Sequence, residues 1–209
     1  MSLAELTLLF TKTNPLASLG AGSSTCSTSC PAGSYINGAK SCALCPVGKW
    51  SDTVGGENVA TCVSCESGTF NDEEGRAALS ACVFCGAGKY SLSAAAASCT
   101  DCGRGKWSAT VGAGDAATCV SCAQGKYNNQ LGSVVIAACT SCLPGRYSLV
   151  TGAAVDAVVC LGCAGGKWSD TAAAFSASTC EDCPGGKWSD TIAADAASTC
   201  VGCVSGRYR

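Results

Sequence analysis

The sequence predicts a small disulfide-rich repeat array: an elongated, solenoid-like rod of short β-hairpin and loop modules with little helix. Three observations lead to this fold class. Cysteine accounts for 20 of the 209 residues, whereas only 6% of the residues are aromatic and 13% are charged. The cysteines recur in pairs at a nearly constant spacing, and a glycine and an aromatic residue follow each pair in fixed register. A chain with so few large apolar groups needs cross-links in place of a conventional core.

The cysteine pairs set the period of the array. Nine C-x-x-C pairs begin at Cys42, Cys62, Cys82, Cys99, Cys119, Cys139, Cys160, Cys180 and Cys200. The steps between them are 20, 20, 17, 20, 20, 21, 20 and 20 residues. Such regularity is typical of a repeat array whose units stack on their neighbours. We therefore divide the chain into a cysteine-free segment, residues 1–25, and about nine to ten repeats of roughly 20 residues, residues 26–209.

A glycine stands three residues after the second cysteine of each pair, and also after Cys30. These glycines are Gly33, Gly48, Gly68, Gly88, Gly105, Gly125, Gly145, Gly166, Gly186 and Gly206. Two explanations fit a glycine fixed at this place. The turn requires a positive φ, or another stretch of backbone passes too close to sulfur for a Cβ.

An aromatic residue follows each glycine by two positions. The ten rings are Tyr35, Trp50, Phe70, Tyr90, Trp107, Tyr127, Tyr147, Trp168, Trp188 and Tyr208. We expect each ring to pack on its own disulfide or a neighbour's, which stabilises a repeat by about 2–3 kcal/mol. Ordering twenty residues costs roughly 20–40 kcal/mol in backbone entropy, so a single repeat needs cross-links and stacked neighbours. The Lys or Arg that usually precedes the ring either lays its stem across an adjacent ring or is simply solvated.

A longer period of 57 residues underlies the short one. KWSDTVGGENVATCVSC from Lys49 matches KWSATVGAGDAATCVSC from Lys106, and KYSLS from Lys89 matches RYSLV from Arg146. Two readings stay open: recent duplication of three repeats at a time, or a rod in which every third repeat faces the same way.

Metal binding and redox catalysis are weaker interpretations of the cysteines. The spacing C-x-x-C-x16-C-x-x-C from Cys42 to Cys65 is that of a zinc ribbon. Zinc would use two consecutive pairs per ion, however, and the sequence does not alternate with a period near 40. The chain also has no His. A thioredoxin-like C-x-x-C is expected once or twice beside a βαβ pattern. We therefore favour structural disulfides in an oxidising compartment and expect no cofactor.

The unit C-x-x-C-x-x-G-[KR]-[WY]-S, followed by a small-residue loop and the next cysteine, resembles the cysteine-rich repeat of the ephrin-receptor-like family. That repeat is similar to the first module of tumour-necrosis-factor receptor repeats, and the resemblance covers residues 26–209. The proline that usually follows the second cysteine in that family stands only at Pro31, Pro46 and Pro184.

The resemblance implies a pairing in which the second cysteine of one pair closes a loop with the first cysteine of the next. The implied disulfides are Cys30 to Cys42, Cys45 to Cys62, Cys65 to Cys82, Cys85 to Cys99, Cys102 to Cys119, Cys122 to Cys139, Cys142 to Cys160, Cys163 to Cys180 and Cys183 to Cys200. Each loop of about 15 residues stabilises the fold by about 3 kcal/mol by restricting the unfolded chain. Cys26 and Cys203 are left over in complementary slots. A head-to-tail intermolecular bond between them is one hypothesis, and the other is that the chain is an excerpt of a longer protein.

Composition excludes several classes of function. The net charge is −2 and the pI is about 5.1, which leaves no basic surface for nucleic acid. We expect no membrane span, because no apolar run approaches about 18 residues. The chain contains no catalytic constellation of the usual kinds, and we expect no enzyme activity. It has no N-x-[ST] sequon, so any glycan would be O-linked.

Two functions remain in contention. The first is a structural subunit of an extracellular filament or cell-surface appendage, such as a flagellar hair or fibril, whose partners are copies of itself or other filament subunits. Its bland Ala-, Gly- and Ser-rich loops and mean hydropathy of +0.26 favour lateral or end-on packing. Residues 1–25 would serve as an assembly strand or a linker. The second is the stalk or ligand-binding module of a cell-surface receptor, for which only the loop NDEEGRAALSA from Asn71 departs from blandness.

Overall fold

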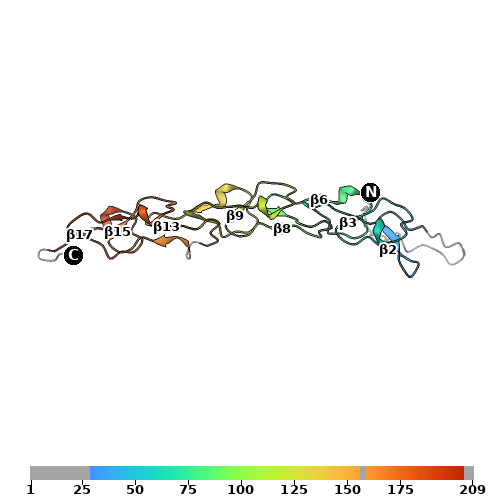
Figure 1. Cartoon of the computed structure of the whole chain (residues 1–209), viewed down its shortest axis with the longest axis horizontal. Helices are drawn as coiled ribbons and strands as arrows, with labels where there is room; N and C mark the ends of the chain where they lie inside the picture. Colours follow the sequence, from blue (N-terminus) through green and yellow to red (C-terminus); the bar gives the residue numbers. More distant parts are fainter. Residues whose placement is uncertain (1–28, 156–158, 205–209) are drawn as a thin grey trace, which may run out of the picture.

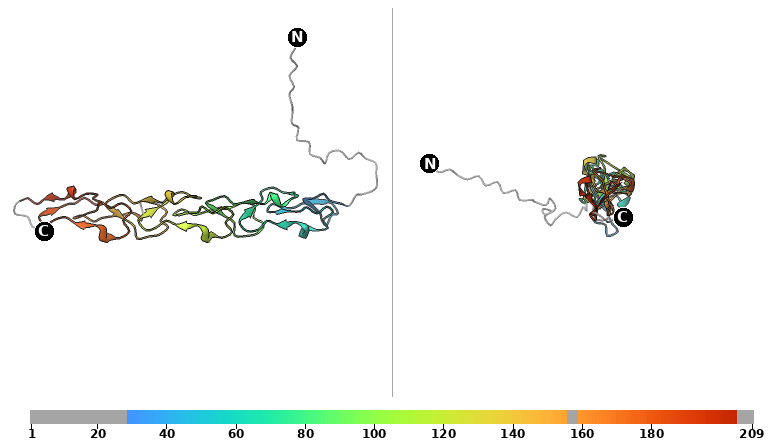
Figure 2. Two further views of the ribbon diagram at one scale, coloured as in Figure 1. Left: turned by 90° about the horizontal axis from the view of Figure 1, so that it is seen from above. Right: turned by 90° about the vertical axis from the view of Figure 1, so that its left-hand side faces the viewer.

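The computed structural model describes residues 29–155 and 159–204. Over these ranges the chain forms a long, thin rod in which successive repeats follow one another along the axis (Figure 1). Viewed from its end, the rod has a compact cross-section (Figure 2). The described elements are short strands and 3₁₀ turns, and nine consecutive disulfides link them. The predicted fold class, a disulfide-rich array of small β-hairpins, is confirmed.

Each repeat contains one two-stranded antiparallel hairpin. In chain order the hairpins are β1 (Ser34–Ile36) with β2 (Cys42–Leu44), β3 (Lys49–Trp50) with β4 (Val63–Ser64), β5 (Thr69–Phe70) with β6 (Val83–Phe84), β7 (Lys89–Tyr90) with β8 (Thr100–Asp101), β9 (Lys106–Trp107) with β10 (Val120–Ser121), β11 (Lys126–Tyr127) with β12 (Thr140–Ser141), β13 (Arg146–Tyr147) with β14 (Leu161–Gly162), β15 (Lys167–Trp168) with β16 (Glu181–Asp182), and β17 (Lys187–Trp188) with β18 (Val201–Gly202). We number the repeats 1 to 9 after these hairpins. Each repeat runs from the cysteine before its first strand, which we call the opening cysteine, to the end of its second strand.

The first strand of each hairpin begins directly after a tight turn. In repeat 5 the amide of Lys106 donates to the carbonyl of Gly103 at 3.2 Å, and Gly105 between them has a φ of +77°. A positive φ at the third residue of a four-residue turn is the requirement of a type II turn, and glycine meets it without strain. The fixed glycine therefore sets the direction in which the aromatic strand leaves the turn.

Within the part of the chain that the structure describes, a 3₁₀ turn precedes the returning strand in six repeats. These turns are η1 (Val59–Thr61), η2 (Leu79–Ala81), η3 (Ala116–Thr118), η4 (Ile136–Ala138), η5 (Ala177–Thr179) and η6 (Ala197–Thr199). The side chains of Asn58, Asp115 and Ser176 cap η1, η3 and η5 by accepting a backbone N–H two residues on. The equivalent residues of η2, η4 and η6 have no capping side chain. Repeat 4 lacks the turn, and its disulfide spans 14 positions instead of 17, which accounts for the one short step in the sequence.

The interior of the rod is made of sulfur and small side chains. The buried apolar residues of the described ranges are cysteines together with Ala113, Ala153, Ala174 and Ala194. The buried polar residues are mostly the serines and asparagines that follow the aromatics. By contrast, many Val, Leu and Ile side chains of the described chain are exposed, so burial of large aliphatic groups does not hold the repeats together.

We expect the caps to stabilise their turns locally. Asp115→Ala removes the oxygen that accepts the amide of Ala117 at 2.8 Å and should cost about 1 kcal/mol, or roughly fivefold faster hydrogen exchange around η3. Ala196→Asp should slow exchange around η6 by a similar factor. Asp195→Ala, which removes an equal charge from a residue that caps no turn, is the control. Unchanged exchange in Asp115→Ala would contradict this account of the turns.

Candidate functional site

The most regular constellation in the molecule is the contact between consecutive repeats, which we call the repeat junction. It consists of the opening cysteine, the turn glycine, the aromatic strand and the residue after the aromatic in one repeat, together with the loop between the two strands of the next repeat. The length and stiffness of the rod therefore depend on how firmly these junctions hold consecutive repeats together.

Three backbone hydrogen bonds form each junction. Between repeats 5 and 6, the amide of Gly105 donates to the carbonyl of Asn128 at 2.7 Å, and the amide of Ser108 donates to that of Ser133 at 2.9 Å. In the reverse direction, the amide of Gly132 donates to the carbonyl of Cys102 at 2.9 Å. The same three bonds, all between 2.7 and 3.1 Å, recur at the eight junctions of the nine repeats. At six junctions the aromatic residue also forms a parallel β-bridge to the loop of the next repeat.

The disulfides close the loops that carry these bonds. Nine bonds join the same cysteine pairs that the resemblance implies, from Cys30–Cys42 to Cys183–Cys200, with Cα atoms 5.4–5.7 Å apart. The opening cysteines Cys45, Cys65 and Cys102 are fully buried. The amide of each following opening cysteine donates to the carbonyl of the turn glycine in the repeat before it, as Cys122 does to Gly105 at 2.8 Å. The sulfurs that a zinc ribbon would need are thus bonded to one another.

The turn glycines also allow a close approach between repeats that are not consecutive. A Cβ added to Gly105 would lie 1.9 Å from the carbonyl oxygen of Gly152, which belongs to repeat 7. The glycines of repeats 1 to 7 all face a backbone carbonyl two repeats ahead in this way. Gly166 and Gly186, which are followed by fewer than two described repeats, have no such neighbour among the described atoms. The turn glycine therefore has both features expected from the sequence, a positive φ and a close backbone neighbour. The atom that leaves no room for a Cβ is a carbonyl oxygen, however, and not sulfur.

A second position of positive φ was not identified from the sequence. It is the loop residue that donates to the opening cysteine of the preceding repeat, and it is Gly55, Gly75, Ala95, Gly112, Gly132, Gly152, Ala173 or Ala193. The signal was present, because in repeats 2 to 9 this residue stands five positions after the aromatic and is Gly or Ala, whereas repeat 1 has Lys40 there with a φ of +58°. The three alanines have φ between +55° and +60°, which costs roughly 1–2 kcal/mol each. The junction hydrogen bond fixes this conformation.

The residue after the aromatic is buried in every repeat from 2 to 9. It is Ser51, Asn71, Ser91, Ser108, Asn128, Ser148, Ser169 or Ser189. In all but Ser91 the side-chain oxygen accepts the backbone N–H two residues on, which turns the chain out of the strand. Asn71 and Asn128 also donate to the carbonyl of Lys49 and Lys106, respectively, in the preceding repeat. Sequence reasoning included this position in the motif but gave it no role.

The predicted aromatics lie at the junctions and are half-buried, except Trp188, which is 44% exposed, and Tyr208, which lies outside the described residues. Packing of each ring on a disulfide stays a prediction. The preceding cation forms an ion pair across the hairpin in two repeats, Lys89 with Asp101 and Lys167 with Asp182. These pairs are exposed and contribute little to stability. Of the two leftover cysteines, Cys203 is a half-buried free thiol and Cys26 lies outside the described residues.

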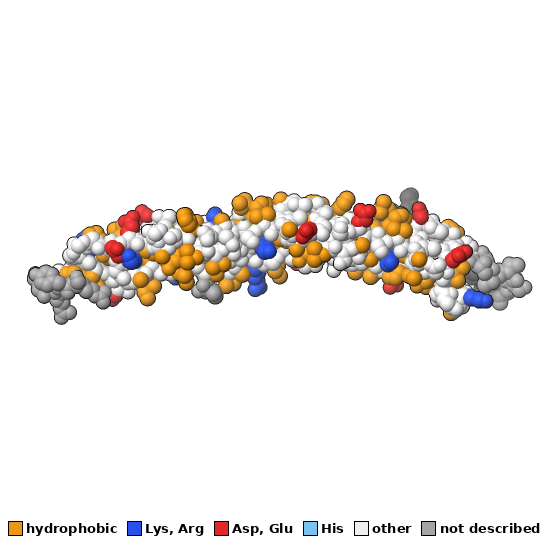
Figure 3. Space-filling view, viewed as in Figure 1, with side chains coloured by type: hydrophobic (Ala, Val, Ile, Leu, Met, Phe, Trp, Pro, Cys, Tyr) orange, Lys and Arg blue, Asp and Glu red, His pale blue; other side chains and the backbone are white. Residues whose placement is uncertain are grey.

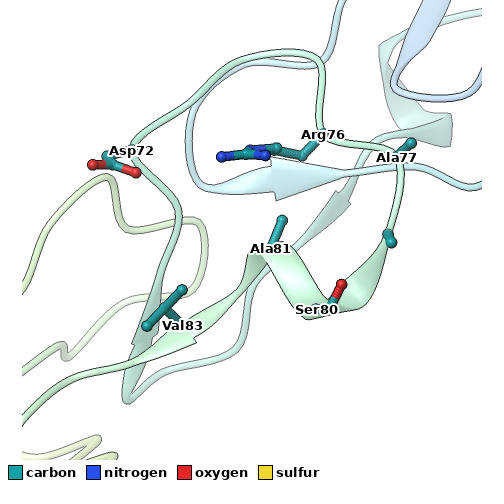
Figure 4. A pocket seen from close by; sticks show the side chains of 7 residues that line it. Asp72, Arg76, Ala77, Ser80, Ala81 and Val83 are labelled. Carbon is teal, nitrogen blue, oxygen red and sulfur yellow. The ribbon is translucent and has the colours of Figure 1, made fainter.

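The outer surface is weakly charged and studded with apolar side chains (Figure 3). A depression of about 390 Å³ lies in the loop that stood out in the sequence, lined by Asp72, Arg76, Ala77, Ala78, Ser80, Ala81 and Val83. In Figure 4 the Arg76 side chain points toward the side on which Asp72 lies, while Ser80 and Ala81 come from η2. An ion pair between Arg76 and Glu73 partly neutralises this loop.

Within residues 29–155 and 159–204, no cluster of three or more His, Cys, Asp or Glu side chains is placed to hold a metal ion. None of the described helical segments is long and apolar enough to cross a membrane. No protein-family model matches the chain, and no curated protein matches it either.

The turn glycine should tolerate no side chain where the second neighbour is present. Gly105→Ala combines a left-handed φ with a clash against backbone and should disrupt repeats 5 to 7. Gly166→Ala has the same φ without the clash and should cost only about 1–2 kcal/mol. Gly103→Ala has neither problem and serves as the control. Hydrogen exchange resolved by repeat measures all three, and equal effects of Gly105→Ala and Gly166→Ala would refute the close approach.

Removal of one disulfide should open the rod locally. In the double variant Cys102→Ser/Cys119→Ser, the loop of repeat 5 loses about 3 kcal/mol of stabilisation. Because repeats contact only near neighbours, limited proteolysis should cut between repeats 3 and 7 and leave both ends of the rod intact. Cys203→Ser, which breaks no intramolecular bond, should leave the cleavage pattern unchanged. Cleavage spread evenly along the chain would show that the rod unfolds as one unit instead.

Proposed function

We propose that this chain is a structural subunit of an extracellular filament or cell-surface appendage, of the flagellar-hair or fibril type. The observation that carries the proposal is the identical set of three backbone hydrogen bonds at every described junction, with a disulfide in every repeat. Such a rod is specified by its main chain and its sulfurs. Such a rod has a defined length and stiffness, and these are the properties that a fibre requires of its subunits.

The disulfides support the proposed location. Nine of them within one small chain are typical of proteins that fold in an oxidising compartment, which favours secretion or display at the cell surface. The repeat motif and its disulfide pairing agree with membership of the ephrin-receptor-like repeats, which we include in the proposal.

The surface supports assembly with other subunits. Many large apolar side chains are exposed along the described rod, among them Phe84 at 66%, Phe175 at 61% and Ile192 at 72%. Contact with a partner would remove part of this apolar surface from water and so favour association. The partners we propose are copies of this chain or other filament subunits. A bond from Cys203 of one copy to Cys26 of another would make such contacts covalent.

A receptor stalk or adhesion module is the second candidate. The depression beside Asp72 and Arg76 favours it, because it lies in the one loop with an unusual density of charge. The lining is otherwise Ala, Ser and Val, and the depression has few polar groups with which to select a ligand. We therefore rank this function below the structural one.

The purified, disulfide-intact chain should associate into elongated polymers at micromolar concentration. Sedimentation velocity and electron microscopy should show particles longer than a single rod, and reduction with thiol should dissolve them by unfolding the repeats. Non-reducing gels of native material would separate covalent from non-covalent links. Monodisperse single rods under all conditions would reject the filament and leave the receptor stalk as the better proposal.

A further inference from the structure

Charge is distributed along the rod in three bands. Residues 29–76 contain three basic residues (Lys or Arg) and six acidic residues (Asp or Glu). Residues 77–155 contain five basic and two acidic residues, and residues 159–204 contain two basic and five acidic residues. The net charges of the bands are therefore −3, +3 and −3. The full sequence keeps the pattern, with −3 for residues 1–76, +3 for residues 77–155 and −2 for residues 156–209. The chain is nearly neutral as a whole because acidic ends offset a basic middle.

Part of the exposed apolar pattern, by contrast, repeats at an interval of three repeats. Four pairs of exposed side chains lie 57 residues, or three repeats, apart: Val54 and Val111 at 66% and 63%, Val63 and Val120 at 51% and 49%, Leu79 and Ile136 at 62% and 67%, and Leu92 and Leu149 at 61% and 54%. The three-repeat period found in the sequence is thus also present at these four surface positions.

The charges change between these matching surfaces while the shapes are kept. Moving three repeats along the chain replaces acidic residues by neutral ones: Asp52 by Ala109, Glu57 by Gly114, Glu66 by Ala123, Asp72 by Asn129 and Glu73 by Gln130. The last two replacements exchange a carboxylate for an amide of the same shape. A displacement of three repeats therefore keeps the four apolar positions and removes five carboxylates, although the surface changes elsewhere, as from Leu44 to Asp101 and from Phe84 to Ser141.

These two patterns select one alignment of neighbouring rods. Two copies packed side by side in register would place acidic bands against acidic bands and the basic band against the basic band. Two parallel copies displaced by three repeats would keep the contacts of the four apolar positions that repeat at that interval. The basic band of each copy would then face an acidic band of the other. Like-charge repulsion thus opposes the first arrangement and complementarity favours the second.

We propose that copies of this chain pack along their sides with a displacement of three repeats, so that residues 77–155 of one copy lie against an acidic band of the next. The proposal rests on the filament function and adds to it the register of its subunits. A staggered contact leaves part of each rod free to bind a further copy, and repetition of this contact produces a continuous fibre.

Zero-length carbodiimide cross-linking of assembled, full-length chains tests the register. A mixture of ¹⁴N- and ¹⁵N-labelled chains distinguishes bonds between copies from bonds within one copy. We expect Lys106 and Lys126 to be joined to acids of residues 52–74 or 170–195 of another copy. Intermolecular bonds that join residues of nearly equal number, such as Lys106 to Asp115, would overturn the displacement.

Matched charge variants test the electrostatic cause. Lys106→Glu/Lys126→Glu should weaken association at low salt by at least tenfold in sedimentation assays, and high salt should erase much of the difference. Lys49→Glu occupies the same place in its repeat as Lys106 but lies in an acidic band, so it should not weaken association. Mixing Lys106→Glu/Lys126→Glu chains with Asp72→Lys/Glu74→Lys chains should restore association.

The outcomes separate this proposal from the function beneath it. Polymers that form equally well from all the variants would reject the staggered register and leave the filament intact. Equal weakening by Lys49→Glu and Lys106→Glu would do the same, since only overall charge would then matter. Failure of the native chain to associate at any salt concentration would overturn both proposals.

Discussion

Contact between main chains is the constraint on which the rod depends. At each of the eight described junctions a repeat donates two amides to the next and receives one in return, and the turn glycines of repeats 1 to 7 lie under a carbonyl oxygen two repeats ahead. Carbonyl and amide groups can approach this closely only where no Cβ intervenes. The disulfide then holds the loop in the shape that presents those groups. Backbone polar groups that would be left unsatisfied in an isolated hairpin are thereby paired along the rod.

Specification by the main chain leaves the outer side chains largely free. The junction uses a glycine, a small loop residue, the cysteines and, in repeats 2 to 9, a Ser or Asn after the aromatic, whereas the exposed positions hold residues as different as Glu74 and Leu131 at equivalent places. The same backbone can therefore display acidic, basic or apolar surfaces without loss of the fold. The charge bands and the apolar pattern are therefore two independent features of the exposed side chains, carried by one repeated backbone.

The sequence was sufficient for the features that repeat identically. The period, the hairpin beside each cysteine pair and the turn glycine followed from spacing, and the disulfide partners from resemblance. The loop residue in the left-handed region was missed because Lys40, Ala95, Ala173 and Ala193 interrupt a series that is otherwise glycine. The buried Ser or Asn was missed because its burial arises only when the next repeat covers it. A role that depends on contact with a neighbouring repeat leaves little signal in the sequence of a single repeat. For the same reason, the close approach of backbone at the turn glycine was expected to involve sulfur.

The order in which the disulfides follow one another has a mechanical consequence. Tension applied to the two ends would pass from Cys102 across its disulfide to Cys119, whose Cα is 5.6 Å away, and then along three peptide units to Cys122. Three extended residues span about 10 Å, so a repeat pulled taut reaches only about 16 Å, whereas twenty unlinked residues would reach about 70 Å. Even with every hydrogen bond broken, the disulfides would therefore hold each repeat to about a quarter of the reach of an unlinked chain.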